Sequence, residues 1–209
     1  MSERVLVLHG LWMRSLVMRP LAARLREQGF QVETLDYASI FRGPEPCIAH
    51  VAQRLRREAE RGLHLVGHSL GGVIAVRAAC EAGAAFRGRI VCLGSPLAGS
   101  TTAQSLLSRG NLSFLIGRSA PLLARGVELP TARDVGMIAG NRGFGVGQLL
   151  HRVASPSDGT VSVAETRLAG LADHVEVPIS HTGLVYSREV ARLAGRFLSE
   201  GRFGPGRDA

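Results

Sequence analysis

The sequence predicts an α/β fold in a single domain, with a sheet of about six mostly parallel strands and helices on both faces. Two observations lead to this prediction. Short apolar runs alternate along the chain with amphipathic segments of helical period, as in proteins whose parallel strands are joined by crossover helices. The chain has 209 residues, of which 45% are hydrophobic, which suits one core better than two. We therefore expect one domain over residues 1–200.

The first part of the chain contains two predicted strands and the helix between them. Val5–Leu8 is an unbroken apolar run, typical of a strand that is buried on both faces. A helix over about 15–28 should follow, and Gly29 is placed to end it. The apolar stripe of this helix consists of Leu16, Leu21 and Leu25. The second predicted strand is Val32–Leu35.

The middle of the chain repeats the alternation. An amphipathic helix rich in Arg and Glu is predicted over 46–61, and it begins at Pro46, a residue that is favoured in a first helical turn. A third strand is predicted at Leu63–Val66, followed by a helix rich in Ala and Val over 71–82. Ile90–Leu93 is the fourth predicted strand.

The last part is expected to hold two more strands, Val135–Ala139 and Val175–Ile179, and a closing helix over 184–198. Between the fourth and fifth strands lies a long segment, 97–134. Its apolar residues suit either a small lid over an acyl pocket or simple packing on the sheet. Residues 201–209 are rich in Gly, Arg and Pro, and we expect them to form a disordered tail.

The chain is strongly basic, with a formal net charge of +8, and all 25 of its basic residues are arginine. A general preference for arginine over lysine explains this, and so does attraction to an anionic partner such as a lipid headgroup. Only 5% of residues are aromatic, and they are not interleaved with arginine, so no nucleic-acid partner is expected. The expected partner is a small-molecule ester or acyl substrate, with transient contact to a membrane surface and the oligomeric state left open.

Cysteine usage and the N-terminus exclude other classes. The three cysteines are odd in number and lack metal-ligand spacing, so neither a disulfide framework nor a metal site nor another cofactor is predicted. Cys80 and Cys92 lie in apolar stretches typical of small buried residues. The first apolar run is too short for a signal peptide or a membrane span, and we expect a cytoplasmic protein.

A Gly-x-Ser-x-Gly motif at residues 67–71 carries the clearest chemical signal. An apolar strand leads into the motif and a helix leads out of it, which is the setting that exposes a nucleophilic serine. The turn is so tight that the neighbours of the serine must lack side chains. Gly67, Gly71 and Gly72 meet this requirement. Ser69 is therefore predicted to be a nucleophile, and the alternative is an ordinary glycine-rich turn.

A serine hydroxyl needs a base in order to attack at neutral pH. In a site of this kind the histidine follows the serine along the chain, with an acid between them. His181 comes directly after the last predicted strand, where the base must lie. The other downstream candidates are His151, on a predicted helix end, and His174, which opens a strand. We predict that His181 is the base.

Three aspartates lie between the serine and the predicted base. Asp158 lies in a loop that leaves the core after the fifth predicted strand. Asp134 and Asp173 precede strands, so they should lie at the opposite edge of the sheet. We predict that Asp158 orients the imidazole and stabilises its protonated form. The alternative is a turn aspartate before a glycine.

Two backbone N–H groups should hold the negative charge that develops on the substrate oxygen. Leu70 follows the nucleophile and supplies one of them. The loop after the first strand, His9–Trp12, should supply the second, with Leu11 as the expected donor and Trp12 as the next candidate. His9 is expected to hold this loop by hydrogen bonds, and His68 is expected to point away from the site.

Five stretches in this order resemble the small bacterial lipases and esterases of the α/β-hydrolase superfamily. They are His9-Gly10, Gly67-His68-Ser69-Leu70-Gly71-Gly72, Gly94-Ser95-Pro96-Leu97-Ala98-Gly99-Ser100, Ser157-Asp158-Gly159-Thr160-Val161 and His181-Thr182-Gly183-Leu184. The resemblance covers about residues 4–199. It implies an α/β-hydrolase fold that begins at what is usually the third strand. The family's nucleophile, acid, base and two oxyanion donors fall on Ser69, Asp158, His181, Leu70 and Leu11.

The pattern as a whole predicts a carboxylic ester hydrolase that works through an acyl-enzyme. A thioesterase or acyltransferase with the same machinery is an alternative, and a binding protein that kept the fold and lost the activity is another. The expected substrate-binding residues are Trp12, Leu97, Leu106 and Leu107. The acyl chain length and the leaving group are left open.

Overall fold

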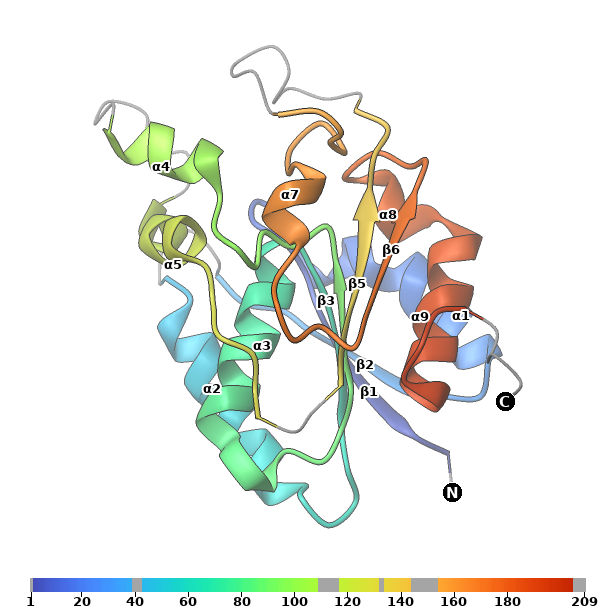
Figure 1. Ribbon diagram of the computed structural model, residues 1–209. Coiled ribbons are helices and arrows are strands. Elements are labelled where there is room, and N and C mark those ends of the chain that lie inside the picture. The colour runs from blue at the N-terminus through green and yellow to red at the C-terminus, as the bar shows by residue number, and fades with distance from the viewer. Residues whose placement is uncertain (1, 39–42, 109–116, 132–133, 144–153, 205–209) are drawn as a thin grey trace.

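The computed structural model of the chain describes residues 2–38, 43–108, 117–131, 134–143 and 154–204, apart from the side chains of Leu106 and Ser108. Within these ranges six strands form one sheet, every strand is parallel to its neighbours, and the order is β2-β1-β3-β4-β5-β6. The strands are β1 (Arg4–Leu8), β2 (Gln31–Leu35), β3 (His64–His68), β4 (Ile90–Leu93), β5 (Val135–Gly140) and β6 (Asp173–Val177). The predicted α/β architecture is confirmed (Figure 1).

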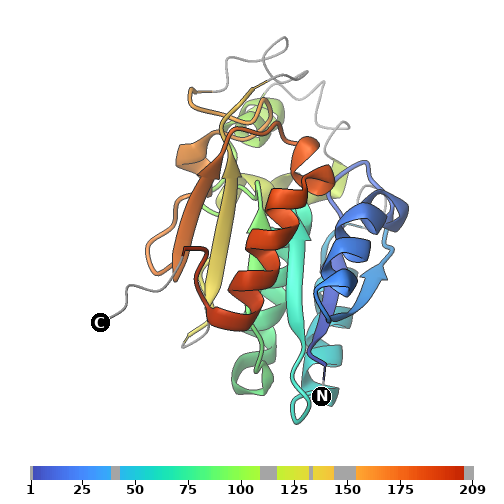
Figure 2. The ribbon, with the colours of Figure 1, turned by 90° about the vertical axis from the view of Figure 1, so that its right-hand side faces the viewer.

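Helices cover both faces of the sheet. α1 (Arg19–Glu27) and α9 (Arg188–Glu200) lie together on one face, and α2 (Glu45–Arg57) and α3 (Leu70–Ala82) lie together on the other (Figures 1 and 2). The shorter helices are η1 (Ser15–Met18), η2 (Gly83–Ala85), α4 (Thr101–Ser108), η4 (Gly117–Ser119), α5 (Ala120–Arg125), α7 (Val163–Thr166) and α8 (Gly183–Tyr186). This layering follows from inner strands, such as β1, β4 and β5, whose side chains are apolar and buried on both faces.

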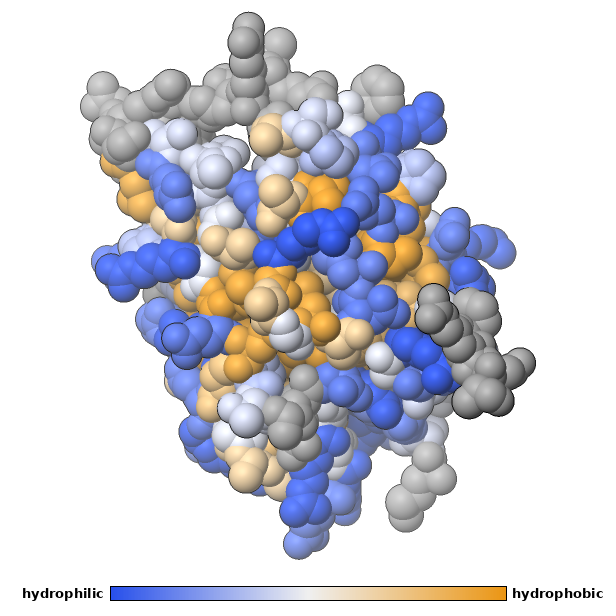
Figure 3. Space-filling view, viewed as in Figure 1, coloured by the Kyte–Doolittle hydropathy of each residue, from blue (hydrophilic) through white to orange (hydrophobic). Residues whose placement is uncertain are grey.

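The strands divide their side chains between two cores, because successive residues of a strand point to opposite faces. In β1, Val5 and Val7 pack beneath α1 and α9, whereas Leu6 and Leu8 pack beneath α2 and α3. All four side chains are buried. The half-buried side chains that extend the core beneath α2 and α3 from two loops are Val127, Leu129, Leu168 and Leu171. Figure 3 shows apolar surface in the middle of the face drawn in Figure 1.

The helix predicted over 15–28 is divided into η1 and α1 by a proline. Pro20 lies in the first turn of α1, where its missing N–H leaves no acceptor unsatisfied, so the α-helix begins there. The residues before it form a separate 3-10 turn. Leu16 lies on that turn and is 58% exposed, contrary to the prediction, while Leu21 and Leu25 are buried as predicted.

Two other expectations were wrong in detail. The last strand was predicted at Val175–Ile179 and lies at Asp173–Val177. It ends there because Pro178 has no N–H to give to a neighbouring strand. Cys80 was expected to be buried and is exposed near the end of α3, whereas Cys92 is buried.

The end of the described chain is packed against the domain. Phe203 is buried, and its ring lies 4.8 Å from that of Phe197, measured between centroids. The backbone N–H of Phe203 donates to Oδ2 of Asp173 at 2.7 Å. The packed chain therefore extends past residue 200, where the tail was expected to begin, and residues 205–209 lie outside the described part.

The arrangement of the sheet brings distant loops together. Because all strands run the same way, their carboxyl ends meet at one edge, and that edge is where sites form in open α/β sheets. α4 and α5 stand at this edge (Figure 1). Ala103, Leu122 and Leu123 of these helices pack in the core beneath α2 and α3. The described part of segment 97–134 is thus packed, and motion of this segment as a lid stays a prediction.

Candidate active site

Ser69 stands between β3 and α3 in a strained backbone conformation. Its φ is 53° and its ψ is −119°, a region that residues with a side chain rarely adopt. The N–H of Ser69 donates to the carbonyl oxygen of Leu93 at 2.8 Å, which ties the turn to the neighbouring strand β4. The side chain of Ser69 is half-buried and lines a cavity at the carboxyl edge.

The glycines of the motif are required by close packing. A Cβ on Gly67 would overlap the backbone of Gly71 and Gly72. A Cβ on Gly71 would overlap the carbonyl oxygen of Leu8 and lie 2.6 Å from that of His9. These positions must therefore lack side chains because α3 lies against the end of β1.

Asp158 and His181 are joined by a short hydrogen bond. Nδ1 of His181 lies 2.6 Å from Oδ2 of Asp158, and the carboxylate is fully buried while the imidazole is 12% exposed. The second carboxylate oxygen, Oδ1, accepts the backbone N–H groups of Thr160 at 2.9 Å and Val161 at 2.8 Å. The backbone N–H of His181 also donates to the carbonyl oxygen of Asp158 at 2.9 Å. The carboxylate is therefore fixed on both sides and orients the ring.

Two glycines leave the space in which this pair fits. A Cβ on Gly94 would lie 2.9 Å from Oδ2 of Asp158 and 3.2 Å from Nδ1 of His181. A Cβ on Gly140, at the end of β5, would lie 2.7 Å from Cβ of Asp158. The ends of β4 and β5 thus approach the carboxylate through backbone alone.

The aspartates that the sequence argument set aside lie away from this pair. Asp134 precedes β5, and its Oδ2 forms an ion pair with Nε of Arg89 at 3.0 Å. Asp173 is the first residue of β6. His174, next to it, lies 2.9 Å from Oγ1 of Thr166 through its Nε2. His151 lies outside the described residues.

The cavity beside Ser69 has a volume of about 270 Å³. Ser69 and His181 both line it, together with residues of the loop after β1, of α4 and of the loop after Asp158. Its polar lining includes the hydroxyl-bearing residues Ser100, Thr102 and Thr160. None of the lining residues within the described chain is Asp, Glu or Arg. The cavity is therefore suited to an uncharged, partly apolar group.

The residues predicted to bind substrate are placed differently from one another. Trp12 lines the cavity and is 61% exposed. Leu97 is fully buried in the core beneath α2 and α3 and is not among the described lining residues. Leu107 lies on α4 with an exposed side chain, also apart from the described lining. The side chain of Leu106 lies outside the described residues.

The loop after β1 is braced from behind, as the sequence argument expected for His9. The Nδ1–H of His9 donates to the carbonyl oxygen of Gly10 at 2.8 Å, and its Nε2 accepts the N–H of Tyr37 at 3.3 Å. The Tyr37 hydroxyl donates to the carbonyl oxygen of His9, and the two rings are stacked 4.0 Å apart. Burial lowers the pKa of His9, in keeping with a neutral ring that donates from one nitrogen and accepts at the other.

This bracing fixes a turn that faces Ser69. The N–H of Met13 bonds the carbonyl oxygen of Gly10 at 3.4 Å, and Trp12 has a positive φ of 60°. Leu11, inside the turn, lines the cavity. Leu70 is the first residue of α3, so its N–H has no acceptor one turn earlier in the helix. The positive end of the α3 dipole also lies here, beside Ser69.

His68 was expected to point away from the site, and this expectation was wrong. The residue lines the same cavity as Ser69. Its Nε2 lies 3.0 Å from the backbone carbonyl oxygen of His181. The motif alone does not contain this information, because the direction of the side chain depends on the loops that surround the turn.

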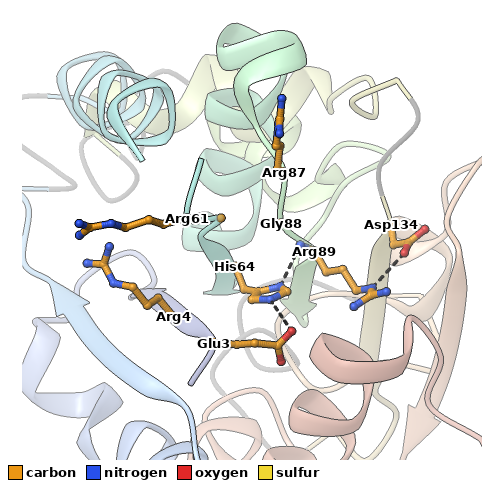
Figure 4. A pocket seen from close by; sticks show the side chains of 9 residues that line it. Glu3, Arg4, Arg61, His64, Arg87, Gly88, Arg89 and Asp134 are labelled. Atoms are coloured by element: carbon orange, nitrogen blue, oxygen red, sulfur yellow. Dashed lines mark hydrogen bonds and ion pairs between the residues drawn. The ribbon is translucent and has the colours of Figure 1, made fainter. Parts of the chain in front are cut away.

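A second cavity, of about 480 Å³, lies at the opposite edge of the sheet (Figure 4). Its charged side chains are engaged in part with one another: Nε2 of His64 lies 3.5 Å from Glu3, and its Nδ1 accepts the backbone N–H of Arg89 at 3.0 Å. Figure 4 shows that Arg61 and Arg87 point in different directions. These side chains do not converge on one point, and we assign no site there.

No group of three or more His, Cys, Asp or Glu side chains among the described residues is arranged to hold a metal ion. In the same part of the chain, every helix is too short or too polar to cross a membrane.

Comparison with solved structures finds proteins with the same fold. A lipase of Bacillus licheniformis, BlEst2 in its propeptide form, is 20% identical with a TM-score of 0.73; the match covers 88% of this chain and 47% of the lipase chain. The metagenomic carboxyl esterase MGS0156 is 15% identical over 95% of this chain and 76% of its own, with a TM-score of 0.73. The thioesterase RedJ of the prodiginine pathway in Streptomyces coelicolor is 14% identical over 92% of this chain and 84% of its own, with a TM-score of 0.60.

The chain spans about half the length of the lipase that it matches, and at these identities the likeness concerns the fold. No curated protein matches the chain. The model of the Alpha/beta hydrolase family matches residues 5–200, which include the six described strands apart from Arg4 of β1, and the cavity beside Ser69. The chain belongs to the alpha/beta hydrolase family.

Proposed function

We propose that the protein hydrolyses carboxylic esters through a catalytic triad of Ser69, His181 and Asp158. The observation that carries this proposal is the 2.6 Å bond between Oδ2 of Asp158 and Nδ1 of His181, whose ring opens on the same cavity as Ser69. Because Nδ1 is engaged by the carboxylate, Nε2 is the nitrogen left to exchange a proton with the serine.

The first half of the reaction forms an acyl-enzyme. Nε2 of His181 takes the hydroxyl proton as Oγ of Ser69 attacks the ester carbonyl carbon. The carbonyl oxygen becomes an oxyanion, which the N–H groups of Leu11 and Leu70 and the start of α3 stabilise. The imidazolium then gives the proton to the alcohol oxygen, and the alcohol leaves.

The second half frees the enzyme. A water molecule gives one proton to Nε2 of His181 and attacks the acyl carbon, and the same oxyanion donors stabilise the second tetrahedral intermediate. Collapse of this intermediate breaks the bond to Oγ of Ser69, which takes back the proton from His181. The products are a carboxylic acid and the resting enzyme.

The cavity indicates the class of acyl group. Its described lining lacks acidic and basic side chains other than the two histidines, and burial holds one of these, His68, in the neutral form. Leaving a charged group in such a cavity without a partner is costly. We therefore propose that the acyl group is uncharged and that its carbon chain lies along Leu11, Trp12 and Leu123.

The experiment is a series of p-nitrophenyl esters of increasing chain length, with matched thioesters, on the wild type and Ser69→Ala. We expect the wild type to turn over the esters, and we expect this turnover to fall by about 10⁴-fold or more in Ser69→Ala. Ser199→Ala, which changes an exposed serine of α9, is the matched control. Faster turnover of thioesters than of esters would favour a thioesterase. A Ser69 that a fluorophosphonate does not label would favour a binding protein.

A further inference from the structure

His68 is the residue directly before Ser69 and makes a specific bond to His181. It lies at the end of β3, and its side chain is fully buried. Its Nε2 is 3.0 Å from the backbone carbonyl oxygen of His181, and the two rings lie 4.6 Å apart between centroids. A carbonyl oxygen only accepts, so Nε2 carries the hydrogen and donates it.

The other ring nitrogen of His68, Nδ1, makes no hydrogen bond with the described residues. With the hydrogen on Nε2, Nδ1 is a buried acceptor, and it has no hydrogen-bond partner among the described residues. Gly10 lies against it, since a Cβ on Gly10 would be 3.0 Å from Nδ1. A buried acceptor without a donor destabilises the fold, so an apolar ring would suit simple packing better here. We therefore expect the hydrogen bond from His68 to His181 to serve a purpose other than packing.

His68 offers this bond without a competing charge. Burial first, and the neighbouring His181 second, lower the pKa of His68 to about 3. A cation 4.6 Å from the ring of His181 would oppose the imidazolium that forms there during the reaction. A buried neutral histidine supplies a hydrogen-bond donor and avoids that repulsion.

We propose that His68 is a positioning residue that fixes the backbone of His181, while Asp158 fixes its ring. This inference rests on the proposed function. Asp158 holds Nδ1 of the ring and, through its carbonyl oxygen, the N–H of His181. His68 holds the carbonyl oxygen of the same residue. Both peptide groups and the ring of His181 are thus tied, which keeps Nε2 in place for the serine.

The test compares two substitutions that differ in the donor. In His68→Gln the side-chain amide nitrogen takes a place close to that of Nε2 and keeps the donor, whereas His68→Phe fills the space and removes it. We expect kcat for the preferred ester to fall about 10²-fold in His68→Phe with little change in KM. In His68→Gln we expect kcat within about fivefold of the wild type. Equal kcat values in the two variants would overturn the proposal.

A double variant separates positioning from general damage to the fold. If His68 acts through His181, His68→Phe has no further effect on the residual turnover of His181→Ala. The same 100-fold loss in both backgrounds would show that the substitution harms the site by another route.

The inference about His68 and the proposed triad are refuted by different results. If Ser69→Ala abolishes turnover and His68→Phe leaves it unchanged, only the inference about His68 is wrong, whereas full activity of Ser69→Ala would refute the triad.

Discussion

The carboxylate of Asp158 binds the imidazole of His181 with one oxygen, at 2.6 Å, and two backbone N–H groups with the other. The carboxylate is an acceptor only, so the hydrogen in the short bond belongs to Nδ1 of His181. This relationship determines the tautomer of the ring, and the first prediction depends on it.

Asp158→Asn should keep the shape of the site and lose most of the catalytic activity. The new amide can donate to Nδ1 of His181, which favours the tautomer with hydrogen on Nε2 and leaves Ser69 without a base. We expect kcat to fall by about 10⁴-fold while the free energy of unfolding changes much less. Steady-state kinetics and urea unfolding measure the two quantities. Asp134→Asn, at the other edge of the sheet, is the control, and a loss under tenfold in Asp158→Asn would contradict the prediction.

Gly71→Ala should destabilise the fold through one added methyl group. Its Cβ would overlap the carbonyl oxygen of Leu8, so α3 must move away from β1. We expect the free energy of unfolding, measured in urea, to drop by about 1–3 kcal/mol or more. Gly204→Ala is the matched control, because among the described residues other than its chain neighbours no heavy atom lies within 4 Å of a Cβ there. Equal stability of the two variants would show that the turn is not as tightly packed as described.

The fold was predictable because its four inner strands, β1, β3, β4 and β5, are almost wholly buried and are short, mostly apolar runs. The edge strands β2 and β6 are only partly buried, and all six strands were found near their predicted positions. Ser69, Asp158 and His181 were predictable as candidates because parallel strands deliver the loops after them to one edge. The order of the motifs along the chain then selected Asp158 over Asp134 and Asp173.

What escaped prediction depends on contacts between distant segments. The direction of His68 is set by Gly10 and by the backbone of His181, which are 58 and 113 positions away in the chain. Leu97 is apolar whether it lines a pocket or a core, and only the folded structure places it in the core beneath α2 and α3. Contact with a lipid surface and motion of segment 97–134 stay predictions.

The pH dependence of stability should contain a contribution from His68. Its pKa is about 3 in the folded protein against an ordinary value of 6.5, so between these values the unfolded chain binds a proton that the folded chain does not. The free energy of unfolding then falls as the pH falls, by about 1.4 kcal/mol per pH unit for this residue. Burial also lowers the pKa of His9, His64 and His174, which adds to the slope.

Urea unfolding between pH 6 and pH 4 tests this contribution. Both His68→Gln and His68→Phe should show a slope shallower by about 1.4 kcal/mol per pH unit, because neither side chain titrates. The two variants should thus agree in this property while they differ in kcat. An unchanged slope in both would mean that His68 binds its proton equally in the folded and unfolded chains.

Trp12 should report occupation of the cavity. It is the single tryptophan of the chain, lines the cavity beside Ser69 and is 61% exposed. An uncharged aliphatic ethyl ester bound to Ser69→Ala should cover the indole, which shifts its emission to shorter wavelength and reduces quenching by acrylamide. A half-ester of a dicarboxylic acid, which carries a charge, is the matched control and should give no shift. A response to the charged ester alone would contradict the neutral character assigned to the cavity.

Glu165 should couple the wall of the cavity to the rest of the domain. Its buried carboxylate accepts the N–H and hydroxyl of Thr101 at 2.6 and 2.7 Å and the N–H of Ser162 at 2.8 Å. These bonds join the start of α4 to the start of α7, and α4 carries the lining residues Thr102 and Ala103. Glu165→Ala leaves the buried N–H of Ser162 and the N–H of Thr101 without this acceptor, so we expect a loss of about 1–3 kcal/mol in the free energy of unfolding.

Glu165→Ala should loosen α4 while the strands of the sheet stay folded. Glu165→Gln keeps one acceptor oxygen and should retain more stability than Glu165→Ala, while Glu189→Ala removes an exposed carboxylate of α9 and should change stability by less than about 0.5 kcal/mol. Hydrogen exchange of the α4 amides, followed in all three variants, separates local from global loosening. Faster exchange in α4 of Glu165→Ala, with β3 still protected, is the expected result. Because α4 lines the cavity, KM should rise in this variant more than kcat falls. Unchanged exchange in α4 would show that the bonds of Glu165 do not hold the helix in place.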